Sequence, residues 1–166
     1  MFKRLALALA CVCAAPVYAS EWQIFADTNG TNAYYFFDRA TVLKQGGSVT
    51  LWIKYVQNLS KPDTDGSYAT AMKEVYVCSK RTNQILSYST YDKDGQFIKS
   101  KQNAGTVTDI APDTIGEGIF KAVCSSDFPN NKSRKLYVPA TNNDPFKHTA
   151  DLFEYFRAQK TDLAPQ

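Results

Sequence analysis

Two cysteines, Cys78 and Cys124, remain after an amino-terminal leader is removed, and this pair restricts the fold more than any other feature. The leader matters because export delivers a chain to an oxidising compartment, where thiols pair. Two remaining cysteines therefore predict a Cys78–Cys124 disulfide. The bond would close a long loop and stabilise the fold by about 4 kcal/mol. The alternative is two buried free thiols.

Residues 1–19 have the pattern of a secretory signal peptide. Its charged start, apolar run and small-residue cleavage site are Lys3-Arg4, the stretch from Leu5, and Val17-Tyr18-Ala19. The run is shorter than the roughly 20 apolar residues of a membrane span. Neither Cys11 nor Cys13 follows the Leu-small-small pattern of a lipidation site. We therefore expect a mature chain from Ser20 in the periplasm or beyond, without a lipid anchor.

The charge of the mature chain excludes one class of partner. The full sequence has nineteen basic and sixteen acidic residues, and two of the basic ones, Lys3 and Arg4, lie in the leader. Loss of the leader leaves a net charge of +1, which is no electrostatic footprint for nucleic acid. One domain with a real core fits the length of this chain.

The first half of the mature chain predicts an antiparallel meander of about six strands. Alternating apolar and polar residues, separated by turns rich in Gly, Asn and Asp, mark these strands: Glu21–Phe25, Tyr34–Phe37, Ser48–Gln57, Ala69–Ser79, Gln84–Tyr91 and the stretch through Phe97-Ile98. Asp27–Gly30 contains the Asn-Gly signal of a tight turn. In the longest strand, Val49, Leu51, Ile53 and Tyr55 share one face.

A helix follows the strands. Thr114 and Glu117 form a capping box, and apolar residues at helical spacing lead to Cys124. A disulfide from the helix end to a strand end would hold the helix on one sheet face, which predicts an α+β fold. Gly116 and Gly118 weaken a helix, so we expect them to mark a close approach of its backbone to the sheet.

The chain is expected to divide into a signal peptide (1–19), an α+β domain (20–126) and a carboxy-terminal extension (127–166). The extension begins with a polar linker, includes a short candidate strand at Lys135–Val138, and ends in an amphipathic helix over Pro145–Lys160. The apolar stripe of this helix consists of Phe146, Ala150, Phe153 and Phe156. It would dock on the open sheet face, on a second copy or on a partner.

Several of these features together resemble a known family. They are a Val-Thr-Leu-Trp-Ile-Lys strand from Val49, the strand carrying Cys78, and a Pro-Asp-Thr-Ile-Gly-Glu helix start before Cys124. The region from Glu21 to Cys124 is similar to the surface-adhesin protein E family of Gram-negative bacteria. The resemblance implies an antiparallel sheet packed on one helix and a role in binding host matrix proteins. It implies no catalytic or ligand residues.

The residues themselves indicate little chemistry. His148, the sole histidine, lies near Asp144 and Asp151 but has no nucleophile or second ligand beside it in the sequence, so we expect neither a catalytic group nor a metal site. Asp63–Gly66 and Asp92–Gly95 lack the spacing of a calcium loop and predict turns. We expect no cofactor.

The candidate binding surface combines one aromatic residue with a basic group around the Cys78 hairpin: Trp52, Lys73, Lys80 and Arg81. Solvated strand-edge charges and internal packing of Trp52 are the competing interpretations. We therefore expect a non-catalytic exported module that binds a protein, such as a host matrix or envelope protein. The alternatives are a periplasmic inhibitor or chaperone-like factor, and an enzyme using Asp63, Asp65 or Glu117.

Overall fold

The computed structural model describes residues 19–27, 33–130 and 138–162. The predicted signal peptide up to residue 18 and the Asn29-Gly30 turn lie outside these residues. Of the candidate strand at Lys135–Val138, only the last residue is described.

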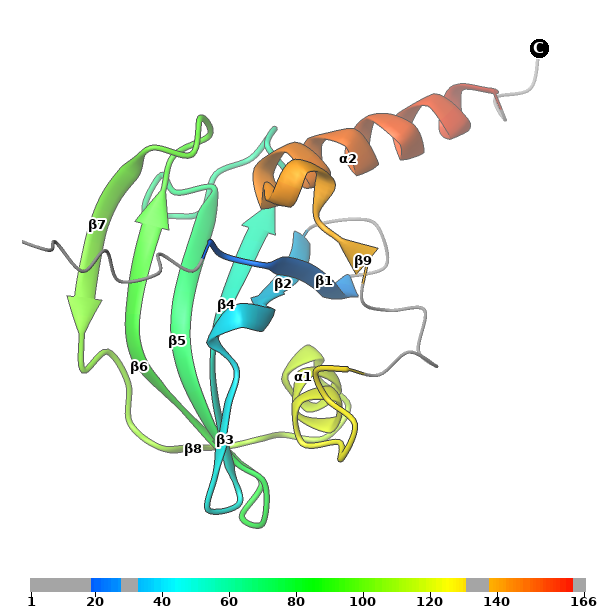
Figure 1. The fold of residues 1–166 in the computed structure, drawn as a ribbon. Coiled ribbons are helices and arrows are strands. Elements are labelled where there is room, and N and C mark those ends of the chain that lie inside the picture. Colours follow the sequence, from blue (N-terminus) through cyan, green and yellow to red (C-terminus); the bar gives the residue numbers. More distant parts are fainter. Residues whose placement is uncertain (1–18, 28–32, 131–137, 163–166) are drawn as a thin grey trace, which may run out of the picture.

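The core of the fold is a nine-stranded antiparallel sheet (Figure 1). Seven strands follow one another in the spatial order β7-β6-β5-β4-β2-β1-β9, while β3 pairs with β4 and β8 pairs with β6. The strands are β1 (Trp22–Asp27), β2 (Ala33–Asp38), β3 (Leu43–Gln45), β4 (Ser48–Gln57), β5 (Ala69–Val77), β6 (Thr82–Tyr91), β7 (Phe97–Gln102), β8 (Thr108–Asp109) and β9 (Val138–Pro139).

The expected count of about six strands is too low. The six expected strands correspond to β1, β2, β4, β5, β6 and β7, and the structure adds three short ones. β8 and β9 have two residues each and β3 has three, so none can display the period-two alternation by which longer strands are recognised. Their positions depend on ladder partners elsewhere in the chain.

The first face of the sheet packs on helix α1 (Ile115–Val123). Because side chains alternate along a strand, Val49, Leu51 and Ile53 of β4 all point to this face and are buried. They form one core with Phe37 and with Ile119, Phe120 and Val123 of the helix. The sequence alternation predicts correctly that these three residues of β4 share one face.

The amino end of α1 has the predicted cap. The Thr114 side chain accepts a hydrogen bond from the Glu117 backbone N–H at 3.1 Å, and Glu117 accepts one from the Asp113 N–H. The explanation of the helix glycines is wrong, however. A Cβ atom at Gly118 would meet nothing within 4 Å, and one at Gly116 would meet only the Thr114 hydroxyl, so neither glycine permits a close approach to the sheet.

The second face of the sheet packs on helix α2 (Pro145–Asp162). Tyr34, Phe36 and Val56 of the strands are buried here beside the amino-terminal half of the helix. The rings of Tyr34 and Phe153 meet edge to face, with 5.3 Å between their centroids. Figure 1 shows α2 above strands β1 and β2 and α1 below them. Of the three predicted docking targets, the described part of this helix therefore uses the open face of its own sheet. The side chain of Phe156 is not among the described ones.

A lysine crosses this second interface. The Lys54 ammonium lies 4.8 Å from the ring centroid of Trp22, 5.0 Å from that of Tyr91 and 5.7 Å from that of Phe146. The three rings join β1, β6 and α2 around one cation on β4, an arrangement that cation–π attraction stabilises. Burial lowers the pKa of Lys54, with a smaller opposing effect from the negative charges of Asp144 and Asp38.

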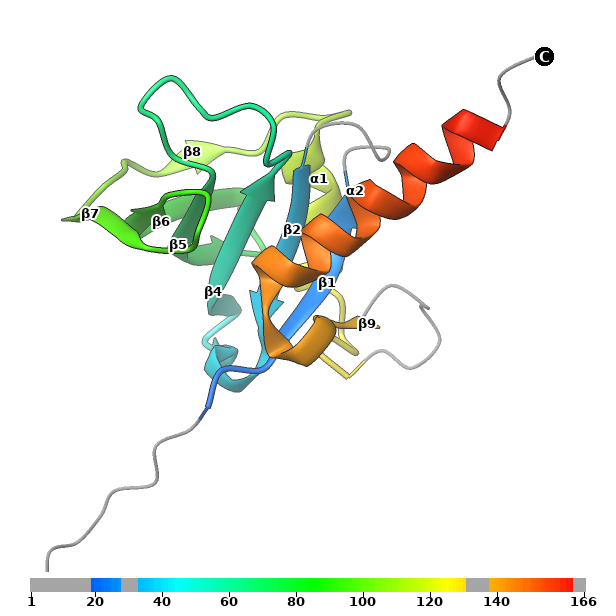
Figure 2. The same ribbon diagram turned by 90° about the horizontal axis from the view of Figure 1, so that it is seen from above.

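The region after residue 126 contributes to both faces. Phe128 is buried in the first core, with its ring centroid 5.0 Å from that of Phe37. Farther along, β9 pairs with β1, and the Asn143 side chain accepts a hydrogen bond from the Trp22 backbone N–H at 2.7 Å. Figure 2 shows α2 beside β1 and β2, with its carboxy-terminal turns extending away from the sheet.

One side of the sheet ends at β7. All six residues of this strand are exposed, including Phe97 and Ile98, and its outer edge has no partner among the described residues. Lys99 and Lys101 on this strand discourage other strands from pairing there, because a new strand would have to accommodate their charges.

Candidate binding surface

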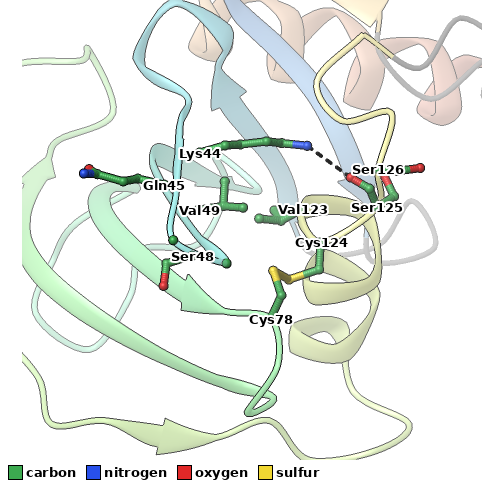
Figure 3. Close-up of a pocket in the computed structure, with 11 residues that line it drawn as sticks. Lys44, Gln45, Ser48, Val49, Cys78, Val123, Cys124, Ser125 and Ser126 are labelled. Carbon is green, nitrogen blue, oxygen red and sulfur yellow. Dashed lines mark hydrogen bonds between the residues drawn. A yellow bond between two sulfur atoms is a disulfide. The ribbon is translucent and has the colours of Figure 1, made fainter.

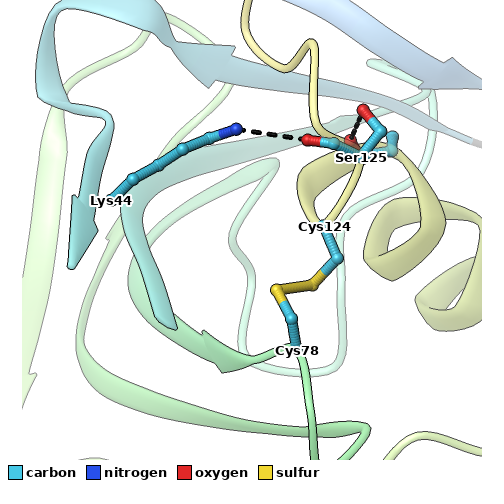
Figure 4. The surroundings of a disulfide bond; sticks show 5 residues. Lys44, Cys78, Cys124 and Ser125 are labelled. Atoms are coloured by element: carbon cyan, nitrogen blue, oxygen red, sulfur yellow. Dashed lines mark hydrogen bonds between the residues drawn. A yellow bond between two sulfur atoms is a disulfide. The ribbon is translucent and has the colours of Figure 1, made fainter. Parts of the chain in front are cut away.

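A disulfide joins α1 to the sheet. Cys78 follows the last residue of β5, and Cys124 is the residue that ends α1. Their sulfur atoms are bonded, as the sequence predicts, and their Cα atoms lie 5.6 Å apart (Figure 4). The bond therefore fixes the carboxyl end of the helix to the carboxyl end of β5.

A hollow of about 380 Å³ lies beside this disulfide, between the β3–β4 hairpin and the end of α1 (Figure 3). Lys44 is the charged residue in its wall. The Lys44 ammonium donates a hydrogen bond to the Ser125 carbonyl at 3.1 Å and lies 5.8 Å from the Phe128 ring. Since its one cation is already engaged with the chain, this hollow offers little for recognition of a ligand.

The structure divides the four residues of the predicted binding surface. Trp52 and Lys73 are directly opposite each other on β4 and β5, on the second face of the sheet. Lys80 and Arg81 lie in the β5–β6 turn. The Arg81 guanidinium turns toward α1, where it pairs with Glu117 at 2.7 Å and lies 5.5 Å from the Phe120 ring. The four residues therefore form two separate pairs, Trp52 with Lys73 on the sheet and Lys80 with Arg81 in the turn.

The three candidate catalytic carboxylates are also separated, since Asp63 and Asp65 precede β5 whereas Glu117 is beside the turn after β5. Glu117 pairs with Arg81 and Lys121, and these bonds lower its pKa to about 2. Hydrogen bonds from Ser67 and Lys99 hold the pKa of Asp65 well below its usual range. A general acid needs a pKa near the working pH, so Asp65 and Glu117 suit ion pairing rather than proton transfer.

A buried carboxylate that the sequence analysis did not consider lies on the first face. Glu74 is 5% exposed, and it accepts hydrogen bonds from the Tyr76 hydroxyl at 2.6 Å and from the Asn83 amide at 3.2 Å. Burial raises its pKa, and the two hydrogen bonds oppose that rise. These partners indicate a structural role within the sheet.

His148 holds the start of α2. Its Nδ1 atom accepts a hydrogen bond from the Thr141 backbone N–H at 3.1 Å, and its ring meets that of Phe36 edge to face. Burial lowers the pKa of His148, and the negative charge of Asp151 partly offsets this effect. Asp151, which the sequence places near His148, therefore affects the pKa of this histidine through its charge. The His148 ring itself packs against the sheet.

We expect acid to weaken this contact. In the folded protein the pKa of His148 is below its ordinary value of about 6.5, so the unfolded chain takes up a proton at a higher pH than the folded chain does. The free energy of unfolding therefore decreases as pH falls below about 6.5. Protonated Nδ1 also cannot accept the Thr141 hydrogen bond. Melting temperatures at pH 7.5, 6.5 and 5.5 should fall more steeply for the wild type than for His148→Gln. Parallel pH profiles would contradict this expectation.

The part of the first face that α1 does not cover has a strip of residues, most of them partly exposed. We name it the tyrosine strip, and it consists of Tyr35, Tyr55, Thr70, Met72, Tyr88 and Thr90. The strand register places Tyr35 opposite Tyr55, Tyr55 opposite Thr70, Thr70 opposite Thr90, and Met72 opposite Tyr88. The rings of Tyr35 and Tyr55 have centroids 5.3 Å apart. All six belong to the face that α1 covers elsewhere, and five of them remain partly exposed.

The loop between β4 and β5 borders the strip. Asp63 and Asp65 of this loop and Thr70, Met72, Tyr88 and Thr90 of the strip line a hollow of about 340 Å³. Asp65 pairs with Lys99 at 2.9 Å, whereas the structure forms no ion pair to Asp63 among the described residues. Burial raises the pKa of Tyr55, and the negative charge of Asp63 adds to this effect.

The tyrosine strip is not among the sites predicted from the sequence. Alternation correctly places Tyr55 on the same face as Val49, Leu51 and Ile53, but it does not show how far along a strand the covering helix extends. A signal was nonetheless present: the apolar residues of that face give way to Tyr55 and Gln57 toward the end of β4. A change from aliphatic to aromatic and polar residues along one face is typical of the rim of a core.

The described residues contain neither a metal-binding cluster nor a membrane-spanning helix. No group of three or more His, Cys, Asp or Glu side chains there could hold a metal ion. None of the described helices is long and apolar enough to cross a membrane.

Comparison with models of known protein families identifies one family. The family model described as surface-adhesin protein E matches residues 22–125. Among solved structures, this chain is similar to protein E from non-typeable Haemophilus influenzae, with 14% identity and a TM-score of 0.46. That match covers 84% of this chain and 93% of the other. Curated protein sequences give no match.

Proposed function

Because this chain belongs to the surface-adhesin protein E family, we propose that it is a non-catalytic exported module that binds another protein. The family match spans the α+β core from β1 to the residue after Cys124 and carries the proposal. An exported, adhesin-like binding role follows from the family. The identity of the partner and the absence of catalysis are our additions.

The described side chains support a binding role over an enzymatic one. Asp65 and Glu117 are tied to Lys99, Arg81 and Lys121, and Glu74 is buried under two hydrogen bonds. The tyrosine strip instead offers rings and hydroxyl groups on a rigid sheet. Tyrosine supplies a large contact area at a low cost in conformational entropy, and protein interfaces are enriched in it.

The location of the protein decides which partner it meets. We propose that the leader sends the chain across the inner membrane and that the mature protein reaches the cell surface, where it binds a host matrix protein. Intact cells treated with protease should then lose the protein, while a periplasmic marker survives. A variant without residues 1–19 should remain in the cytoplasm and serve as the control.

Protection from protease in intact cells, with release by osmotic shock, would exclude direct host adhesion. The protein would then act inside the envelope, as an inhibitor or chaperone-like factor for a bacterial protein. If the variant without residues 1–19 still reached the periplasm, residues 1–19 would not be the export signal.

A further inference from the structure

We propose that the tyrosine strip, with Asp63 at its rim, receives an arginine side chain from a protein partner. This inference rests on the proposed binding function and names the chemistry of the contact.

The strip is a site for side chains rather than for a partner's backbone. Its residues lie on β2, β4, β5 and β6, and each of these strands has a neighbour on both sides. Their main-chain N–H and C=O groups are therefore used within the sheet, and only rings, hydroxyls and carboxylates remain for recognition. A peptide that added a strand would need a free edge, such as that of β7, which is remote from Tyr35 and Tyr55 in the strand order.

An unsatisfied hydroxyl lies beneath the wall of this hollow. Thr90 is 3% exposed, and its Oγ1 atom has no hydrogen-bond partner among the described residues. Buried hydroxyls are normally paired. The Thr90 hydroxyl is thus an unsatisfied polar group under the hollow, but it is too deeply buried to contact a ligand itself. Thr70 lies directly opposite Thr90 and provides a second hydroxyl in the same wall.

The charge at the rim favours a cation. Asp65 is neutralised by Lys99, but Asp63 has no ion-pair partner among the described residues, so its negative charge is available. That charge reaches the strip, because it contributes, after burial, to the raised pKa of both Tyr35 and Tyr55. For Tyr35, Glu74 contributes more than Asp63. An anionic ligand would be repelled here.

Arginine matches this combination better than other cations. Its guanidinium is planar, stacks on aromatic rings and presents five N–H donors at once. Stacking on tyrosine, pairing with Asp63 and donation to the partly exposed Thr70 hydroxyl are thus within the capacity of one group. The hollow, at about 340 Å³, is at the small end of the roughly 300–1,000 Å³ typical of ligand pockets, which suits one inserted side chain.

The strip contains its own probe. The sequence has two methionines, and Met1 belongs to the leader, so Met72 gives the single methionyl methyl signal of the mature chain in NMR spectra. We would titrate exported mature protein, labelled with ¹³C at the methionine methyl, with acetyl-Gly-Arg-Gly-amide. The matched probe is the same peptide with citrulline, which keeps the shape of arginine but has no charge.

The arginine peptide should shift the Met72 signal saturably, and the citrulline peptide should not. Asp63→Asn should weaken binding by about twofold to fivefold, the range expected for one partly exposed charge pair. Asp109→Asn is the control variant, because Asp109 is an exposed carboxylate beside Thr82, at the other end of β6 from Thr90. It should leave the affinity unchanged.

Three results would overturn the inference: no saturable shift with the arginine peptide, equal shifts with citrulline, or equal affinities for Asp63→Asn and Asp109→Asn. The proposed function has its own test on intact cells, so the two failures are distinguishable. If the protein is exposed at the cell surface but does not bind the arginine peptide, the tyrosine strip is not an arginine site and the proposed adhesin role still holds.

Discussion

Replacing both cysteines, Cys78 and Cys124, by alanine should lower the free energy of unfolding by about 4 kcal/mol, the chain-entropy value for a loop of this length. The bonded residues are 46 positions apart, and the open loop gives the unfolded chain much more freedom. The melting temperature should fall by about 10 °C in a chain of this size. Differential scanning calorimetry of the mature protein measures both quantities.

The reductant dithiothreitol provides the control for this experiment. It should lower the melting temperature of the wild type toward that of the double variant and leave the variant itself unchanged. A wild type insensitive to reductant, or full alkylation of both cysteines without reduction, would contradict the bond. The α1 end would show the loss first, because the disulfide fixes Cys124 to the end of β5.

The second large effect is expected at the α2 interface. Phe146→Ala with Phe153→Ala should cost about 3 kcal/mol, given roughly 1.5–3 kcal/mol for each fully buried ring and the partial exposure of both. The melting temperature should drop by about 8 °C, with lower solubility as Tyr34, Phe36 and Val56 lose their cover. Circular dichroism melting curves and sedimentation of the soluble fraction measure the two effects.

The control variant is Glu154→Ala, an exposed position next to Phe153 on the same helix, which should change the melting temperature by less than about 2 °C. Unchanged stability of the double variant would contradict internal docking and favour a helix that binds a partner. Point variants are preferable to truncation after Ser126, because truncation also removes Phe128 from the first core. In a truncated chain, the loss of Phe128 could not be separated from the loss of α2.

Local sequence patterns predicted the parts of the fold that are determined locally. The alternation at Val49, Leu51 and Ile53 placed these residues on one face of β4, and the Thr114–Glu117 pair identified the start of α1. Both depend on residues within a few positions of one another. The pairing of Cys78 with Cys124 was predicted too, because only two cysteines remained after the leader.

Features that depend on distant partners could not be read from the sequence. β9 is a strand only because β1 is beside it, and Phe128 is a core residue only because Phe37 is available. The orientation of Arg81 depends on an ion pair with Glu117 of α1, which is distant in the sequence. The tyrosine strip depends on where α1 stops covering the sheet.

The pairing of β1 with β9 also has a consequence for the order in which the protein can be completed. Strand β1 is separated from its neighbour β9 by more than a hundred positions in the sequence, since Ile24 lies opposite Val138. Contacts of such long sequence separation slow folding, because the chain must close a large loop before they form. A chain that emerges amino end first, from a ribosome or across a membrane, can pair β1 with β2 early, but the other edge of β1 stays open to proteases and chaperones until nearly all of the chain has emerged.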